Sequence, residues 1–347
     1  MKKLLLSFSL IACLSSYAQR DNVFFEDCSS MTVGNIGTDL TGTNAGQNGW
    51  LTFVSSTASP AGQNSDFQVV NTGSPQGNAM QITGTTASVT GQARYLFKDI
   101  SSDWTNRTSG NDIAQVEFKL FTGPATASVN TFRMYMFDAS GATALCGFYY
   151  VPSTKVLKGW AHYDNAGTVG YYVFQLGSGA DITLTENTWY NIAVSFDYNT
   201  GDITWKESNG LFYGGVTGAD AGVDVGELDF LITQAAAANT AAAQVIVDDV
   251  YVNFDSTETL LGVKQNSIVA NKTAVYPNPT KDIVNVSNTE ALINSVEISD
   301  VNGRVVKTVK VSDLNNAQIN IADLSQGVYM IKINSDKGTA TKKVVKE

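Results

Sequence analysis

Residues 274–347 read AVYPNPTKDIVNVSNTEALINSVEISDVNGRVVKTVKVSDLNNAQINIADLSQGVYMIKINSDKGTATKKVVKE. A strand-like run, Val296–Val301, ends at Asn302-Gly303, a pair that tolerates the positive φ angles of a two-residue hairpin turn. Farther along, apolar and polar residues alternate as in a half-buried strand, which places Tyr329, Ile331 and Ile333 on one face. The stretch therefore predicts a small all-β sandwich of short strands.

Four motifs make this stretch resemble the type A C-terminal sorting domain of the type IX secretion system. They are YPNP at Tyr276–Pro279, SDVNGRVV at Ser299–Val306, DLSQGVYMIKI at Asp323–Ile333 and TKKVVKE at Thr341–Glu347. The resemblance implies an immunoglobulin-like fold, a bacterium of the Bacteroidetes type, and an address that outer-membrane secretion machinery reads and that is removed after export. The signal residues that it implies are Tyr276, Pro277, Asn278, Pro279, Gly303, Gly327, Tyr329 and Lys343. An ordinary immunoglobulin-like module is the alternative.

The N-terminal residues have the layout of a secretory signal peptide, predicted at residues 1–18. Lys2 and Lys3 precede the apolar run Leu4–Leu14, and Ser16-Tyr17-Ala18 supplies small residues for cleavage. Residues 10–13 also resemble a lipoprotein cleavage box, which is the alternative. No later run is long enough to cross a bilayer. Together with the tail, this predicts passage through the periplasm to the medium or the cell surface.

Charge is unevenly distributed along the chain, whose formal net charge is −10. Residues 274–347 hold nine Lys/Arg and eight Asp/Glu, whereas residues 20–273 hold 11 and 24, a net charge of −13. An acidic body argues against nucleic acid and anionic membrane surfaces as partners. It is compatible with bound calcium.

Residues 21–255 show no sustained helical periodicity. Turn signals separate strand-like runs at Gln115–Phe121, Thr131–Phe137, Cys146–Val151, Gly170–Leu176, Trp189–Asp197 and Gln244–Phe254. Many short strands at this rhythm indicate a sandwich or barrel. The polar residues 256–273 then predict a linker to the tail.

Three segments of this body resemble the concanavalin/laminin-G-like jelly rolls. They are VFFEDCSS at Val23–Ser30, ENTWYNIAVSFDYNTGDITW at Glu186–Trp205 and VIVDDVYVNF at Val245–Phe254. The resemblance implies a jelly-roll β-sandwich, with Trp189 in its core, followed by the small immunoglobulin-like sandwich. A fold of this kind does not identify a function.

Carboxylates near the first and last strands of the body suggest a structural Ca²⁺ site. Strand alternation places Asp248 on the same face as Ile246 and Val250, where a carboxylate is costly unless it is paired or binds a metal. In jelly rolls of this kind the first and last strands lie side by side, so the hypothesis is that Glu26 and Asp248 help to bind one Ca²⁺. The alternative is that both are solvated or paired with Lys or Arg.

A group of aromatic residues suggests a surface for sugar binding, because a flat ring with a polar rim stacks well on a sugar face. Its members are Tyr149, Tyr150, Trp160, His162, Tyr163, Tyr171 and Tyr172, of which Tyr150, Trp160, His162 and Tyr172 are the predicted ligand-binding residues. Trp160 and His162 share a face if their segment is extended. Core and cross-strand packing is the alternative.

No catalytic residue is assigned. Glu227 and Asp229 echo the start of the carboxylate motif of jelly-roll glucanases, but Leu231 and Ile232 follow where a third carboxylate is required. The predicted function is therefore a non-catalytic module for glycan or matrix. An enzyme acting on polysaccharide, as a hydrolase or lyase, and a purely structural adhesion domain are the alternatives. Cys28 and Cys146 are expected to be buried thiols, although an oxidising compartment would permit a disulfide.

Overall fold

The structure, a computed structural model, describes residues 20–55, 61–73, 75–86, 92–234, 239–261, 273–288, 292–300, 304–335 and 338–347. The chain divides into two compact units between Leu261 and Gly262. The predicted signal peptide, Gly303 with its hairpin turn, and residues 262–272 of the predicted linker lie outside the described residues.

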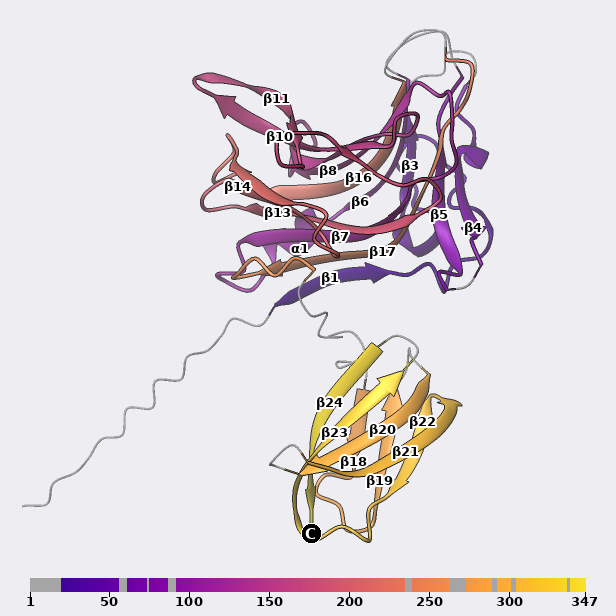
Figure 1. Cartoon of the computed structure of the whole chain (residues 1–347), viewed down its shortest axis with the longest axis vertical. Coiled ribbons are helices and arrows are strands. Elements are labelled where there is room, and N and C mark those ends of the chain that lie inside the picture. Colours follow the sequence, from indigo (N-terminus) through magenta and orange to yellow (C-terminus); the bar gives the residue numbers. More distant parts are fainter. Residues whose placement is uncertain are drawn as a thin grey trace, which may run out of the picture. The chain divides into compact units, whose positions relative to one another are not determined.

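The first unit contains a nine-stranded sheet, here called sheet A (Figure 1). Its strand order is β15 (Tyr213–Thr217), β14 (Asp202–Glu207), β13 (Trp189–Asp197), β7 (Ile113–Phe121), β17 (Gln244–Asp255), β5 (Asn78–Thr83), β4 (Phe67–Asn71) and β2 (Gly34–Asn35), with β1 (Asp21–Glu26) paired to β17.

An eight-stranded sheet, sheet B, packs against sheet A. Its strand order is β11 (Thr168–Gln175), β10 (Val156–Asn165), β9 (Ala144–Val151), β8 (Asn130–Asp138), β16 (Val225–Gln234), β6 (Ala93–Asp99) and β3 (Leu51–Val54), with β12 (Ile182–Thr183) paired to β10. The described helical segments are η1 (Gln47–Gly49), η2 (Asn64–Asp66) and α1 (Ser101–Thr105). None of the helices within the described ranges is long and apolar enough to cross a membrane.

Aromatic side chains fill the space between the two sheets. The Phe230 ring of β16 lies 5.1 Å from Phe118 of β7 and 6.0 Å from Trp50, measured between ring centroids. Trp205 of β14 is also buried, and its indole N–H donates to the Gly147 carbonyl of β9 at 2.7 Å. The predicted jelly-roll β-sandwich is therefore present. The prediction that Trp189 lies in this core was wrong, because Trp189 is only half-buried at the start of β13.

Strand β17 changes faces halfway along its length. Its pairing with β7 slips between Asp248 and Tyr251, and Asp249 has a φ of 48°, which is the geometry of a bulge. The side chains of β17 in the apolar core are consequently Val245 and Val247 before the bulge and Val250, Val252 and Phe254 after it. The prediction that Ile246, Asp248 and Val250 share one face was wrong, since the extra residue resets the alternation.

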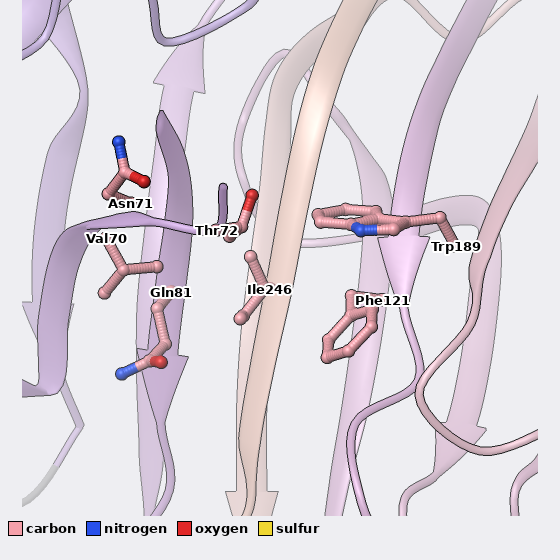
Figure 2. Close-up of a pocket in the computed structure, with 7 residues that line it drawn as sticks. All are labelled: Val70, Asn71, Thr72, Gln81, Phe121, Trp189 and Ile246. Carbon is pink, nitrogen blue, oxygen red and sulfur yellow. The ribbon is translucent and has the colours of Figure 1, made fainter. Parts of the chain in front are cut away.

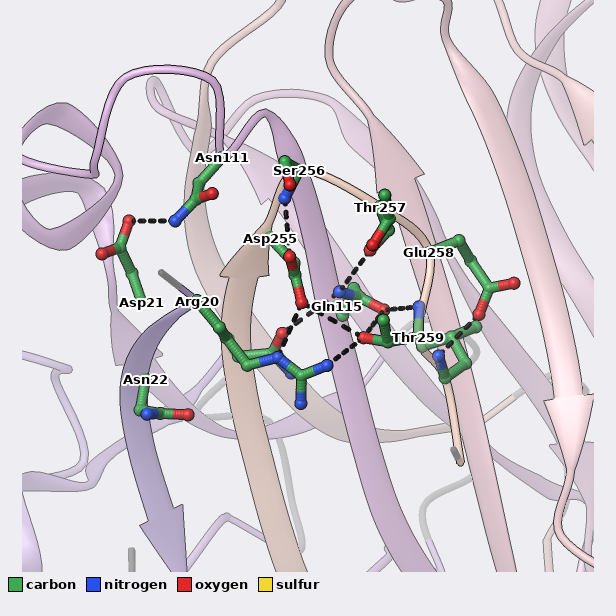
Figure 3. Close-up of polar contacts among 12 residues, drawn as sticks. Arg20, Asp21, Asn22, Asn111, Gln115, Asp255, Ser256, Thr257, Glu258 and Thr259 are labelled. Carbon is green, nitrogen blue, oxygen red and sulfur yellow. Dashed lines mark hydrogen bonds and ion pairs between the residues drawn. The ribbon is translucent and has the colours of Figure 1, made fainter. Parts of the chain in front are cut away.

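The chain does not leave the sandwich where β17 ends. Residues 256–261, here called the exit segment, bind to the outer side of sheet A (Figure 3). The backbone N–H groups of Thr259 and Leu261 donate to the side chains of Gln115 and Glu117 on β7, at 2.8 and 2.9 Å. Lys206 donates to the Leu260 carbonyl at 2.6 Å, and Leu260 is fully buried. The first part of the predicted linker is therefore packed on the body.

The same network reaches the first strand. The Arg20 guanidinium donates to Asp255 at 2.7 Å and also to Thr259, and the Asn111 amide donates to Asp21 at 2.9 Å (Figure 3). Side-chain contacts thus link the residue preceding β1, the end of β17 and the exit segment.

The second unit is the predicted small β-sandwich. One sheet has the order β18 (Thr273–Tyr276), β19 (Ile283–Asn288) and β22 (Asn316–Asn320), and the other has the order β21 (Val305–Leu314), β20 (Ile293–Asp300), β23 (Gly327–Ser335) and β24 (Gly338–Lys346). Tyr329, Ile331 and Ile333 are buried on one side of β23, as the alternation predicts, and Lys332 on the other side is exposed.

Asn278 connects the YPNP turn to the last strand of this unit. Its side-chain amide donates to the Lys343 carbonyl at 2.9 Å, and its side-chain carbonyl accepts from the Val345 N–H at 2.9 Å. Tyr329 is buried in the core and its hydroxyl donates to the Ser325 carbonyl at 2.8 Å, whereas the Lys343 side chain is exposed. The motif residues far apart in sequence are therefore joined in one structural unit.

We predict that replacing Leu260 with alanine destabilises the first unit by about 2–4 kcal/mol, because it removes a fully buried side chain from the exit segment. Urea unfolding followed by tryptophan fluorescence measures this loss. Leu211→Ala is the matched control, since Leu211 is 43% exposed and its truncation should change the stability little. Equal stabilities for the two variants would show that residues 256–261 are merely a tether.

Candidate functional site

Four aromatic side chains and one arginine gather on the outer side of sheet B, the side that faces away from sheet A. We call this set the aromatic face. It consists of Arg133 and Tyr135 on β8, Tyr149 on β9, Trp160 on β10 and Tyr171 on β11. Strand alternation explains the grouping, because the neighbours of these residues along each strand, such as Met134, Phe148 and Ala161, point into the core.

Trp160 lies at the centre of the aromatic face. Its ring centroid is 5.6 Å from Tyr171 and 6.4 Å from Tyr149, with interplanar angles of 20° and 15°. Tyr135 is 5.2 Å away at 36°. The rings of Tyr149, Trp160 and Tyr171 are thus close to parallel across three neighbouring strands, and Tyr135 on the fourth is tilted.

Arg133 adds a positive charge to these rings. Its guanidinium carbon is 5.2 Å from the Trp160 ring centroid and 5.3 Å from that of Tyr149, within the range of a cation–π interaction. It also donates to the Tyr135 hydroxyl at 3.0 Å. The arginine therefore holds the central rings in place and offers polar N–H groups beside them.

Solvent access to the aromatic face increases toward the edge strand. Tyr135 is only 4% exposed, Trp160 is half-buried, and Tyr171 on β11 is 50% exposed. Val173, which pairs with Trp160, is 47% exposed on the same strand. A ligand would therefore reach Tyr171 first. Arg133 and Tyr135 could not be assigned to the site from sequence, because they lie in an ordinary alternating strand.

His162 extends the aromatic face by one position. Its ring lies 5.1 Å from Tyr171, and Nδ1 is 2.8 Å from a carboxylate oxygen of Asp220. The prediction that Trp160 and His162 share a strand face is confirmed by their positions on β10. Because the Asp220 carboxylate accepts a hydrogen bond from Nδ1, Nε2 is the ring nitrogen left for a ligand.

Two of the predicted ligand-binding residues are elsewhere. Tyr150 is fully buried in the core, where its hydroxyl donates to the Thr122 carbonyl at 2.9 Å. Tyr172 lies on the opposite side of β11 from Tyr171 and packs edge-on against Tyr163 at 5.8 Å. Both predictions fail for one reason: adjacent residues of a strand point to opposite faces, and Tyr149 and Tyr171 are the outward members of the two tyrosine pairs.

Glu227 and Asp229 form a carboxyl pair on β16, next to the aromatic face. Asp229 pairs across the strands with Tyr135 and Phe97, and Leu231, which follows on the same side, is buried. Burial and the neighbouring Glu227 carboxylate raise the pKa of Asp229 well above its usual range, and burial also raises the pKa of Glu227. A hydrogen bond joins the two side chains. Burial and the neighbouring carboxylate thus both favour the protonated form of Asp229.

The two carboxylates of the calcium hypothesis have different surroundings. Glu26 is buried and accepts hydrogen bonds from the Cys28 N–H at 2.9 Å, the Asn48 amide at 3.0 Å and the Trp50 indole at 3.3 Å. N–H donors thus surround its oxygens, which does not fit a calcium ligand. Asp248 Oδ1 is buried and has no hydrogen-bond partner among the described residues, and burial raises its pKa to about 7. Across the described part of the chain, no three His, Cys, Asp or Glu side chains form a metal cluster.

Cys28 and Cys146 are both free, buried thiols. Burial raises the pKa of each thiol above its usual range, so neither is a candidate nucleophile.

One family of known proteins matches part of the chain. Residues 274–347 match the family described as "Secretion system C-terminal sorting domain". No curated protein is similar enough in sequence to count as a match.

Solved structures that resemble the chain are distant in sequence. A Bacillus licheniformis β-glucanase is 10% identical over 68% of this chain and 99% of its own, with a TM-score of 0.41. The CBM2 module of the evolved Dit of Lactobacillus casei BL23 phage J-1 is 12% identical over 70% and 99%, with a TM-score of 0.39. A sialidase is 7% identical over 56% of this chain and only 16% of its own length, with a TM-score of 0.38. Each likeness concerns the arrangement of strands alone.

We predict that the stability of the protein falls as pH rises from about 4, the ordinary pKa of aspartate, through the raised pKa of Asp229. The sign follows because the folded state holds a proton that the unfolded state has already released. Asp229→Asn does not titrate and should show a flatter dependence of melting temperature on pH. Asp103→Asn, an exposed position on α1, is the control and should follow the wild type. Parallel curves for all three proteins would contradict the assignment.

The calcium hypothesis makes a separate prediction. If Asp248 binds Ca²⁺, a chelator lowers the melting temperature of the wild type, and Asp248→Asn abolishes this response. Differential scanning calorimetry with and without chelator measures both. An unchanged wild-type melting temperature removes the hypothesis.

Proposed function

We propose, starting from the fact that residues 274–347 are a type IX secretion C-terminal sorting domain, that the first unit is a glycan-binding module. The sorting domain means that the chain is exported to the cell surface or secreted. The observation that carries the proposal is the row of near-parallel rings at Tyr149, Trp160 and Tyr171, of which Tyr171 is half exposed.

The chemistry of the aromatic face suits a sugar. Its rings offer apolar area to the C–H groups of a pyranose, while Arg133 and His162 offer polar groups to the hydroxyls around its rim. The acidic body, at −13 over residues 20–273, opposes a polyanionic ligand. A neutral polysaccharide or glycan of the extracellular matrix is therefore the class that fits.

The export route gives the other partner. The second unit would be read by the outer-membrane secretion machinery through the surface that its YPNP turn and last strand build together. A signal peptide at residues 1–18 would bring the chain into the periplasm first. Because the exit segment packs on the body, removal of the tail would fall beyond Leu261.

A polysaccharide-acting enzyme is the second candidate, and the Glu227–Asp229 pair favours it. A protonated carboxyl beside a carboxylate is the kind of acid and base that glycan cleavage needs. Against it, the two groups bond to each other, whereas the flanking carboxyls of retaining hydrolases stand about 5 Å apart. Release of reducing ends from a polysaccharide, lost in Glu227→Gln, would favour the enzyme. Binding without product release would favour the module.

We predict that Tyr171→Ala weakens binding to a neutral polysaccharide about tenfold, because it removes the most accessible ring of the aromatic face. Affinity gel electrophoresis against laminarin, xyloglucan and galactomannan measures the effect. Tyr213→Ala is the matched control, because Tyr213 is 69% exposed on the edge strand of the other sheet. Retardation that is equal in both variants and the wild type would exclude the aromatic face as the site.

A further inference from the structure

The outer side of sheet A carries a pocket of about 300 Å³ (Figure 2), whereas the aromatic face lies on sheet B. Its lining residues come from five segments and are Val70, Asn71, Thr72, Gln81, Phe121, Trp189 and Ile246. The volume is at the small end of the range for ligand sites in proteins. It would accommodate one small ligand rather than a protein segment.

Strand register explains how the pocket is built. Trp189 pairs with Phe121, Phe121 with Ile246, and Ile246 with Gln81, so these side chains form one row across β13, β7, β17 and β5. The row continues beyond Gln81 to Gln68 and Asn35. One row thus passes from two aromatic rings through an aliphatic residue to three amides.

Its two ends offer different chemistry to a ligand. The Trp189 and Phe121 rings lie 5.2 Å apart at 41°, and Figure 2 shows them together on one side of Ile246, with Gln81, Asn71 and Val70 on the other. Both rings are only half-buried, because Trp189 is the first residue of β13 and Phe121 the last residue of β7. Half-exposed rings in such a position are available for stacking.

The Gln81 amide is available for hydrogen bonding. Among the described residues, its Nε2 donates to the Thr83 hydroxyl at 3.4 Å, which is long for a hydrogen bond. Asn71, by contrast, is fixed, since it donates to Asn78 at 3.1 Å and accepts from the Gly73 N–H at 3.0 Å. The polar end of the pocket therefore has one weakly bonded amide, Gln81, beside one held by two hydrogen bonds, Asn71.

The pocket is uncharged. None of its lining residues is ionisable. The nearest ionisable positions along β7 and β17 are Lys119 and Asp248, which pair with each other across the two strands, and Lys119 forms an ion pair with Asp249 at 2.7 Å. An ionic ligand would find no partner there, and a wholly apolar one would leave the Gln81 amide unsatisfied. The fitting ligand has an apolar face and a rim of hydroxyl groups.

We propose that this pocket is a second carbohydrate site, which takes one ring of a neutral oligosaccharide with its C–H face on Trp189 and Phe121 and its hydroxyls toward Gln81. It lies on the opposite sheet from the aromatic face and does not depend on the function proposed for that face. Two such surfaces on one module would let it engage two chains of a polymer.

The experiment uses the full chain labelled with 5-fluorotryptophan, whose five tryptophans give five fluorine resonances. Trp189→Phe and Trp160→Phe assign the two resonances of interest while keeping a ring at each position. The probes are cellotetraose, laminaritetraose, maltotetraose, mannotetraose and xylotetraose. A saturable shift of the Trp189 resonance with at least one probe supports the second site. A shift of the Trp160 resonance alone, or no shift of the Trp189 resonance with any probe, overturns the proposal. A shift of the Trp189 resonance alone supports the pocket as a carbohydrate site and counts against the aromatic face.

A second variant guards against a change of fold at Trp189. Gln81→Leu removes the amide but keeps the size of the side chain, and it should weaken the binding seen at Trp189 about fivefold, the effect of one lost hydrogen bond. Gln318→Leu, an exposed position on β22 of the second unit, is the matched control and should bind as the wild type does. Equal affinity for Gln81→Leu and the wild type would contradict the proposed orientation of the sugar.

Discussion

The first unit depends on the pairing of β17, the last strand of its sequence. This strand has β7 on one side from Ile246 to Asp255, and on the other side β5 pairs with its first half and β1 with its second half. In both halves of β17 the apolar side chains must point into the core. The bulge at Asp248 and Asp249 makes this possible, because the extra residue resets the alternation of faces. Sheet A therefore cannot be completed until both the beginning and the end of the unit are present, which makes its pairings non-local.

This closure explains the contacts at the end of the unit. Once β17 lies between β7 and β1, its end at Asp255 meets Arg20, and the following residues are carried over Gln115 and Glu117. Backbone groups of the exit segment satisfy polar side chains on sheet A that are otherwise buried. The exit segment thus completes the packing of the first unit before the chain continues to the sorting domain. The first unit and the sorting domain have separate hydrophobic cores.

Much of the fold could be predicted from the sequence, because strand alternation and turn residues are local signals. The strand at Trp189–Asp197 was predicted to the residue, and the inward side of β23 was predicted correctly. The bulge in β17 could not be foreseen, since nothing in VIVDDVYVNF shows which residue is left unpaired. The same limit applies to the sites. In pairs such as Tyr149-Tyr150 and Tyr171-Tyr172 the sequence shows that one ring faces out but not which one, and the row from Trp189 to Gln81 exists only once four strands are in register.

The central claim is that the sandwich keeps its core closed and presents a ring-lined outer surface of sheet B to glycan. Hydrogen–deuterium exchange of the full chain, with and without the polysaccharide that it retains best, tests this most directly. The account predicts that the polysaccharide slows exchange in β10 and β11, residues 156–175, while β23 and β24 of the sorting domain exchange as before. Slower exchange confined to the sorting domain, or unchanged exchange throughout the first unit, would contradict it.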